Sequence, residues 1–433
     1  MPGMDMPGMN HDMSGMKGMD HCNMPGMNHD QMAGMDMSSS AEGGPFHTMG
    51  GEGSGTSWMP ASTPVYGKMY MKGNWMFMLH GQELIRFNDQ TGGRGADAIN
   101  AQGWFMFMGD HKLGAGTFQF RTMFSPDPIF QAAPDPELFQ HGETYHGQPI
   151  IDGQHPHNLF AELAAEWTVP VSKNFALQLY GGPVGEPALG PTAFMHRPII
   201  GVPLGHHNED STHISEGVAT FGVIAYKFKV EGSLFHGAEP GENRFGIYTG
   251  GLDSWSSRVS FAPTRDWTMQ VSHGELHKPE ALEPGNQSRT TASLQYNHAF
   301  NDKTNIASAL IWGRTRQIVA GTSNAYTFET MLTRGKTDLF TRLELLDVDG
   351  LLQTNIFDEP AIVPSSLIGN PARPFRVGAF NYGAVRDFYT TASLRLGFGG
   401  SVSTYHVPNL LVATYGAHPI GFQVFLRVRF GKI

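Results

Sequence analysis

The feature that most constrains the fold of this chain is an alternation of apolar and polar residues with a period of two. It is clearest near the C-terminus, where Phe422, Val424 and Leu426 alternate with Gln423, Phe425 and Arg427. Shorter examples lie at 175–179, 292–297 and 393–396. Each segment has about ten residues between turn residues, which is typical of strands that face lipid on one side and a polar lumen on the other.

Sixteen segments after residue 70 fit this pattern. The expected strands are 74–88, 98–109, 115–124, 164–171, 174–182, 216–226, 228–237, 252–262, 266–275, 289–299, 303–316, 323–333, 337–347, 374–383, 386–397 and 420–430. The fold class predicted is therefore all-β, a transmembrane antiparallel β-barrel of about 16 strands, within a range of about 14 to 18.

The connections between these strands alternate in length. Short turns are expected at Ser172–Asn174, Pro263–Asp266, Phe300–Lys303, Arg334–Thr337 and Ala384–Asp387. Long loops are expected at 125–163, 183–215, 276–288, 348–373 and 398–418. Short turns at one end and long loops at the other are typical of bacterial outer-membrane barrels, and an even strand count places both termini on the periplasmic side.

A soluble β-sandwich is the alternative fold. It would have to accommodate charged side chains on the faces opposite the apolar ones, namely Glu329, Arg342, Glu344, Arg395, Arg427 and Arg429. Burying such charges in an apolar core is costly, whereas a barrel lumen accepts them, so the barrel is favoured.

Composition excludes several classes of protein. The chain has 433 residues and a net charge of −10, so it offers no basic surface for nucleic acid. It has one cysteine and therefore no internal disulfide, and no apolar run is long enough for a transmembrane helix. A protein of the outer membrane needs a secretory signal, but residues 1–20 contain no apolar core, so the numbering is expected to describe a processed chain.

The N-terminus has a different composition. Twelve of the 24 methionines fall within residues 1–37, and the heptad MPGMNHD occurs at Met6–Asp12 and again at Met24–Asp30. Gly, Pro and Asn between the methionines prevent an amphipathic helix, so this tail is expected to be disordered. A flexible Gly/Ser linker is expected to follow, which gives a tail and linker at 1–60 and a barrel at 61–433.

The tail has the chemistry of a soft-metal site, because thioethers bind Cu(I) or Ag(I) and imidazole binds copper in either oxidation state. A low-complexity spacer is the alternative, although a spacer has no need of interleaved methionine and histidine. The expected tail ligands are Met4, Met6, Met9, His11, Met13, Met16, Met19, His21, Cys22, Met24, Met27, His29, Met32, Met35 and Met37.

A Met/His/Asp-rich N-terminus (Met1–Met37) ahead of an outer-membrane barrel resembles the bacterial copper-resistance B-type outer-membrane proteins. The closing strand GFQVFLRVRF is also similar to the aromatic-ended terminal strand of outer-membrane proteins. The resemblance implies copper tolerance, with periplasmic copper bound at the tail and then sequestered or passed outward. A periplasmic copper carrier or oxidase is the partner expected besides outer-membrane lipid.

Two of the expected long loops are rich in histidine. The phrases HGETYHGQPIIDGQHPHN and FMHRPIIGVPLGHHNEDSTHIS are expected to meet above the barrel. Imidazole and carboxylate together suit Cu(II) or Zn. Any single histidine is more readily explained as a hydrogen-bonding loop residue, so the metal site is expected of the clusters taken together. The expected loop ligands are Asp152, His155, His157, His196, His206, His207, Asp210 and His213.

Two other functions are alternatives for this sequence. Ser211, His213 and Asp210 are close in sequence, but adjacency does not make a catalytic triad and there is no G-x-S-x-G motif, so no enzyme activity is expected. A general porin is the stronger alternative, with arginines such as Arg342 and Arg427 lining its pore and the tail as an accessory or plug.

Overall fold

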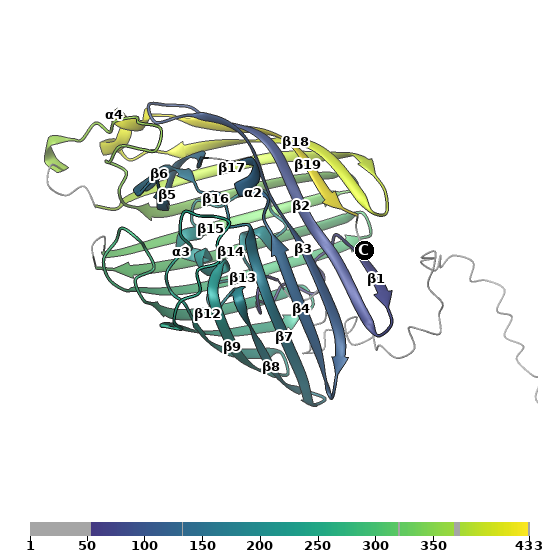
Figure 1. Cartoon of the computed structure of the whole chain (residues 1–433). Helices are drawn as coiled ribbons and strands as arrows, with labels where there is room; N and C mark the ends of the chain where they lie inside the picture. The colour runs from purple at the N-terminus through teal and green to yellow at the C-terminus, as the bar shows by residue number, and fades with distance from the viewer. Residues whose placement is uncertain (1–52, 132, 319–320, 368–372, 432–433) are drawn as a thin grey trace, which may run out of the picture.

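The computed structural model describes residues 53–131, 133–318, 321–367 and 373–431, and its main feature is a closed barrel of sixteen antiparallel strands (Figure 1). The ring runs β2–β3–β4–β7–β8–β9 and then in sequence from β10 to β19, which pairs with β2. The expected tail ligands between residues 4 and 37 lie outside the described residues. The barrel strands are β2 (Trp75–Gln90), β3 (Asp97–Leu113), β4 (Gly116–Phe124), β7 (Phe160–Ser172), β8 (Phe175–Gly185), β9 (Ser215–Ala225), β10 (Phe228–Phe235), β11 (Ser254–Thr264), β12 (Trp267–Leu276), β13 (Gln287–Asn301), β14 (Thr304–Gln317), β15 (Gly321–Arg334), β16 (Thr337–Val348), β17 (Phe375–Thr390), β18 (Leu394–His406) and β19 (Ile420–Phe430).

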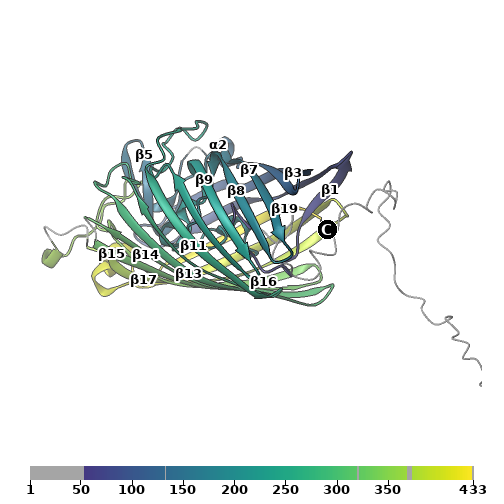
Figure 2. The same cartoon turned by 90° about the horizontal axis from the view of Figure 1, so that it is seen from below.

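The expected sixteen-stranded barrel is confirmed, and so is the alternation that predicted it. In β19, Phe422 and Val424 are exposed on the outer face, whereas Phe425 and Arg427 are buried inside. The long loops gather at one end of the barrel and the short turns at the other, as Figures 1 and 2 show from two sides. Among the described residues, no helix combines the length and the apolar character needed to cross a membrane.

The boundary between β17 and β18 differs from the expectation. The expected turn at Ala384–Asp387 is wrong, because Arg386 pairs with Thr337 and Asp387 points inward to Arg427 and Arg429. Arg386 therefore continues β17 on its exposed face, and Asp387 faces the lumen, so neither residue forms a turn. The real turn lies at 391–393, and β18 continues to His406 inside the segment expected to be a loop.

Three strands were not predicted. β1 (Gly67–Lys72) pairs with the first residues of β2, while β19 pairs with the remainder of that long strand. The Gly67 amide donates to the Gly431 carbonyl at 2.8 Å, so β1 continues the line of β19 along the same edge. β5 (Asp135–Tyr145) and β6 (Gln148–Gln154) form a separate hairpin within the first long loop.

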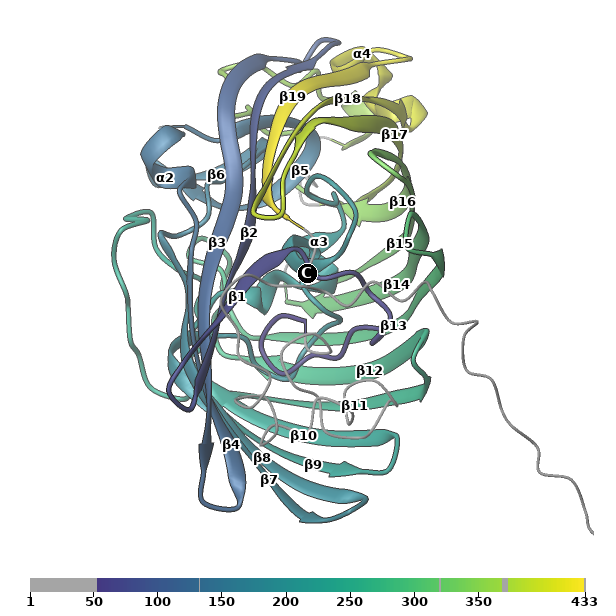
Figure 3. The ribbon, with the colours of Figure 1, turned by 90° about the vertical axis from the view of Figure 1, so that its right-hand side faces the viewer.

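The inside of the barrel is filled by inward-folded loops, and Figure 3 shows α3 within the ring of strands. The hairpin packs Leu138 and Phe139 against Leu346 of β16 and Tyr405 of β18, so the core lies between the inner wall and the loops. The helical turns of the described chain are α2 (Asp127–Phe130), η2 (Phe194–His196), α3 (His206–Glu209), η3 (Ser211–His213), η4 (Ser365–Leu367), η5 (Asn409–Leu411) and α4 (Val412–Tyr415).

The end of the expected Gly/Ser linker is also inside the barrel. Residues 53–58 are buried rather than loosely exposed. Lys229 donates to the carbonyl of Thr56, Arg258 donates to the Thr56 hydroxyl at 2.9 Å, and Ser57 donates to Thr192 at 3.1 Å. Because Lys229 and Arg258 of the barrel wall donate hydrogen bonds to Thr56, this segment is held in a defined position inside the barrel.

Candidate metal site in the lumen

Five imidazoles from the two histidine-rich loops form a closed ring inside the barrel. Successive ring centroids are 6.2 Å apart for His155 and His157, 5.5 Å for His157 and His213, and 6.0 Å for His213 and His206. The separations are 4.1 Å for His206 and His207 and 6.0 Å for His207 and His155. We call these five residues the imidazole ring, by which we mean the closed circle of five side chains and not the ring of a single histidine. The two loops were expected to meet above the barrel, but they meet within it.

The loop 186–214 is held in the lumen by ion pairs with the barrel wall. Arg197 donates to Glu329 of β15 at 2.6 Å and to Asp210 at 2.7 Å. Glu329 also accepts from Arg342 of β16, whose guanidinium donates to the carbonyls of Gly201 and Val202. Because these charges are buried, each needs its partner, and the set fixes the loop that carries His206, His207 and His213.

Three imidazoles of the ring are each anchored through one nitrogen. His157 Nδ1 donates to Asp127 at 2.7 Å, His213 Nδ1 donates to the Asp210 carbonyl at 2.7 Å, and His206 Nε2 donates to Gln154 Oε1 at 3.2 Å. These acceptors fix the tautomers, because a carbonyl oxygen can only accept. The second nitrogen of each ring is then an available lone pair, the arrangement that metal-binding histidines use.

The best-arranged donors belong to His206, Asp210 and His213. One ligand atom from each of the three lies within 4.8 Å of the others. His206 Nδ1, Asp210 Oδ1 and His213 Nε2 are all buried and have no hydrogen-bond partner among the described residues. Buried polar atoms without partners are costly, so a water molecule or a cation is needed there. Two imidazoles and a carboxylate fit Cu(II) or Zn.

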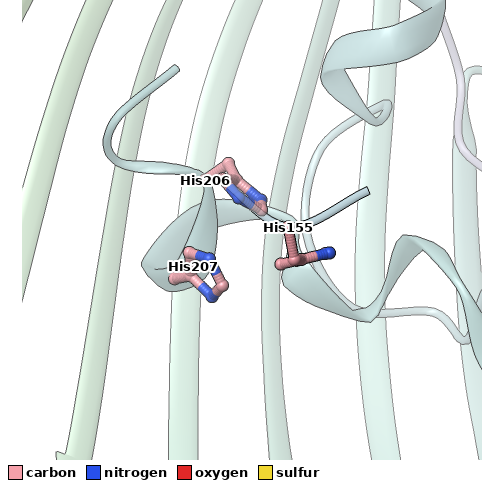
Figure 4. A group of neighbouring side chains, drawn as sticks. All are labelled: His155, His206 and His207. Atoms are coloured by element: carbon pink, nitrogen blue, oxygen red, sulfur yellow. The ribbon is translucent and has the colours of Figure 1, made fainter. Parts of the chain in front are cut away.

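A second group overlaps the first. His155, His206 and His207 also offer ligand atoms within 4.8 Å of one another, and Figure 4 shows their rings beside α3. His155 is less free than the others, since its Nε2 lies 2.9 Å from Glu143 and its Nδ1 lies 3.0 Å from the Pro156 carbonyl. The cavity among the rings has a volume of about 20 Å³, which is room for about one water or one ion.

Burial sets the protonation of three members of the ring, His206, His207 and His213. It lowers the pKa of His213 to about 3 and lowers the pKa of His206 and His207 well below the usual value, with neighbouring histidines adding to the effect. These imidazoles are therefore neutral at neutral pH, the form that binds metal. Burial also raises the pKa of Asp210, and Arg197 opposes that shift.

Two expected loop ligands lie elsewhere. Asp152 is bound by Arg94 at 2.9 Å and accepts from Tyr415 and from the Phe139 amide, so its charge already has a structural partner. His196 packs against Trp104, with ring centroids 4.4 Å apart and tilted ring planes, and lines a different cavity. The interpretation that these two join the other loop ligands is wrong, because sequence proximity does not determine which way a loop residue faces.

The structure contains one further group of possible metal ligands, which was not predicted from the sequence. His141, Glu283 and Asp349 offer ligand atoms within 4.8 Å of one another near the outer end of the lumen. They come from three different loops, so only the spacing of the loops in the closed barrel brings them together. No signal within any one loop could have shown this.

The charged side chains expected to line a pore are largely paired. Arg427 bonds Asp338 and Asp387, each at 2.8 Å, and Arg429 bonds Asp387 at 3.0 Å. Glu344 accepts from the Gly205 amide at 3.0 Å. These groups face the lumen as predicted, but they hold folded segments together instead of lining open water.

Solved structures share this architecture. OmpF from Salmonella typhi, solved with daunomycin, matches with a TM-score of 0.52 at 10% identity, covering 84% of this chain and 100% of that one. OprB from Pseudomonas putida matches with a TM-score of 0.51 at 9% identity, covering 82% of this chain and 94% of that one. No family model and no curated protein matches the chain. The chain therefore has the fold of the sixteen-stranded porins.

Proposed function

We propose that this chain is an outer-membrane protein that binds copper and contributes to copper tolerance. The observation that carries the proposal is that His206, Asp210 and His213 each offer one ligand atom within 4.8 Å of the others. His206 Nδ1, Asp210 Oδ1 and His213 Nε2 are also buried without a hydrogen-bond partner among the described residues. The outward apolar face of the barrel supports a place in the outer membrane. No step of the proposal requires catalysis.

The methionine tail is assigned the capture of Cu(I) on the periplasmic side, because its thioethers suit this soft ion. Residues 53–58 are bound inside the lumen, so the tail is tethered directly to the barrel interior. A periplasmic copper carrier or oxidase would supply the ion. Silver is the second soft ion that these ligands suit.

Copper tolerance of cells tests the proposal. We compare the wild-type chain with the double variant His206→Asn/His213→Asn, and with His273→Asn as a control because His273 is a half-exposed strand residue outside the ring. Tolerance should fall in the double variant alone. Full tolerance in that variant, at equal amounts of folded protein in the outer membrane, would contradict the proposal.

A general diffusion channel is the second candidate, and the similarity to solved porins favours it. Its consequence is a steady conductance that does not depend on copper. Planar-bilayer recording distinguishes the two functions, since a lumen closed by the Arg197, Glu329 and Arg342 ion pairs should conduct poorly.

A further inference from the structure

A second cavity in the lumen is lined by methionine. Its volume is about 130 Å³, and it lies toward the short-turn end, where Asn305 and Thr333 stand near the ends of β14 and β15. Gly53, the first described residue after the tail, also lines it. The thioethers on its wall belong to Met59, Met78, Met106, Met108, Met195 and Met331.

Strand register brings these thioethers together. Met78 of β2 stands directly opposite Met108 of β3, and His80 stands opposite Met106. Met106 is in turn opposite Met123 of β4. Side chains of directly opposed residues on one face of a sheet have Cβ atoms about 5 Å apart, which is within reach of shared coordination.

Two histidines complete the donor set. The His80 and His196 rings lie 6.1 Å apart, and His80 Nε2 is buried without a hydrogen-bond partner among the described residues. Met195, next to His196, packs in the same cluster as Met78, Met106 and Met108. The donors are thus thioether sulfur and imidazole nitrogen from the wall and from the inward loop.

We propose that this cavity is a binding site for Cu(I) within the barrel, with Met78, Met106, Met108 and Met195 as sulfur ligands and His80 or His196 as the nitrogen ligand. Soft ligands select a soft monovalent ion over Zn or Cu(II). The site extends the proposed function, because it gives the ion a place between the tail and the imidazole ring.

The position of the cavity supports that role. Trp104 and Met195 line it and also line a smaller cavity of about 30 Å³, whose wall includes His157 of the imidazole ring. The two metal-ligating clusters are therefore separated by one small space. Ordinary core packing by methionine is the alternative, since its flexible side chain fills irregular gaps.

The test uses the full-length chain with all twelve tail methionines changed to leucine, together with Cys22→Ser, His11→Asn, His21→Asn, His29→Asn and His47→Asn, so that tail binding does not mask the lumen. Ag(I) serves as the probe, and titration should find one strongly bound equivalent. The double change Met106→Leu/Met108→Leu should abolish it, while Met269→Leu, on the outer face of β12, should not. Leucine conserves volume, so the barrel should remain folded.

A second measurement covers the case in which the double variant fails to fold. In the wild-type barrel, the methyl carbon signals of Met106 and Met108, assigned by single leucine variants, should shift on addition of Ag(I). Unshifted signals, or an equivalent of Ag(I) that survives in the double variant, would overturn the proposal. Loss of the imidazole ring by His206→Asn/His213→Asn should leave this Ag(I) equivalent in place, which separates failure of this site from failure of the proposed function.

Discussion

At the scale of single residues, two aspartates from the histidine-rich loops have different environments. Asp152 has its charge neutralised by Arg94 and adopts a positive φ of 60°, which aspartate and asparagine tolerate better than most residues. Asp210 accepts a hydrogen bond from Arg197 through Oδ2. Its Oδ1 has no hydrogen-bond partner among the described residues and lies 3.9 Å from His206 Nδ1. Only the second arrangement provides a ligand atom, and the sequence shows no difference between the two.

Asp152→Asn tests this assignment. The change preserves the backbone conformation but leaves the buried Arg94 without its counter-charge, which should cost about 3 kcal/mol or more of stability. The thermal midpoint of the detergent-solubilised barrel should fall, while copper stoichiometry should stay the same. The exposed Asp97→Asn is the control and should change neither. A loss of bound copper in Asp152→Asn would show that Asp152 is a ligand after all.

At the scale of elements, strands were predictable and inward loops were not. The period-two pattern depends on which face each residue presents, so segments such as 266–275 and 420–430 matched β12 and β19 closely. The β17–β18 turn was misplaced because Asp387, which pairs with lumenal arginines, is polar like a turn residue. The β5–β6 hairpin has no simple periodicity, and its place depends on packing inside a barrel that must already be closed.

The loop 186–214 should detach when its central ion pair is broken. Arg197→Ala leaves Glu329 and Asp210 short of a counter-charge and should cost about 3–5 kcal/mol, because both partners are buried. We expect the conductance in planar bilayers to rise as the lumen opens. Arg376→Ala removes an exposed pair with Asp347, should cost about 1 kcal/mol or less, and should leave conductance unchanged. Equal conductance in the two variants would show that the ion pairs do not close the lumen.

At the scale of the whole molecule, three groups of possible metal ligands follow one another along the lumen of the barrel. Thioethers of the cavity beside Gly53 come first, the imidazole ring lies beyond, and His141, Glu283 and Asp349 lie past His207. The order runs from a cavity rich in thioethers, through five imidazoles, to a group of one imidazole and two carboxylates. The sequence predicted the ring residues from their clustering, but the thioether cavity depends on strand register, which composition does not reveal.

The tail's contribution belongs to the same scale. Changing its twelve methionines to leucine should remove most of the Cu(I) bound by the full chain, because leucine keeps the bulk and loses the sulfur. Competition with a chromophoric Cu(I) chelator under reducing conditions measures the stoichiometry. A tail with the same residues in scrambled order should still bind, because the number of thioethers is unchanged. Unchanged stoichiometry in the leucine variant would leave the tail as a spacer.

The central claim is that the imidazole ring binds copper inside the barrel, and electron paramagnetic resonance of Cu(II) tests it most directly. Both samples carry His11→Asn, His21→Asn, His29→Asn and His47→Asn, so that the imidazoles of residues 1–60 contribute nothing. We expect nitrogen couplings from at least two imidazoles, and their loss on adding His206→Asn/His213→Asn. A spectrum with oxygen ligands alone, or one that the double change leaves unaltered, would contradict it.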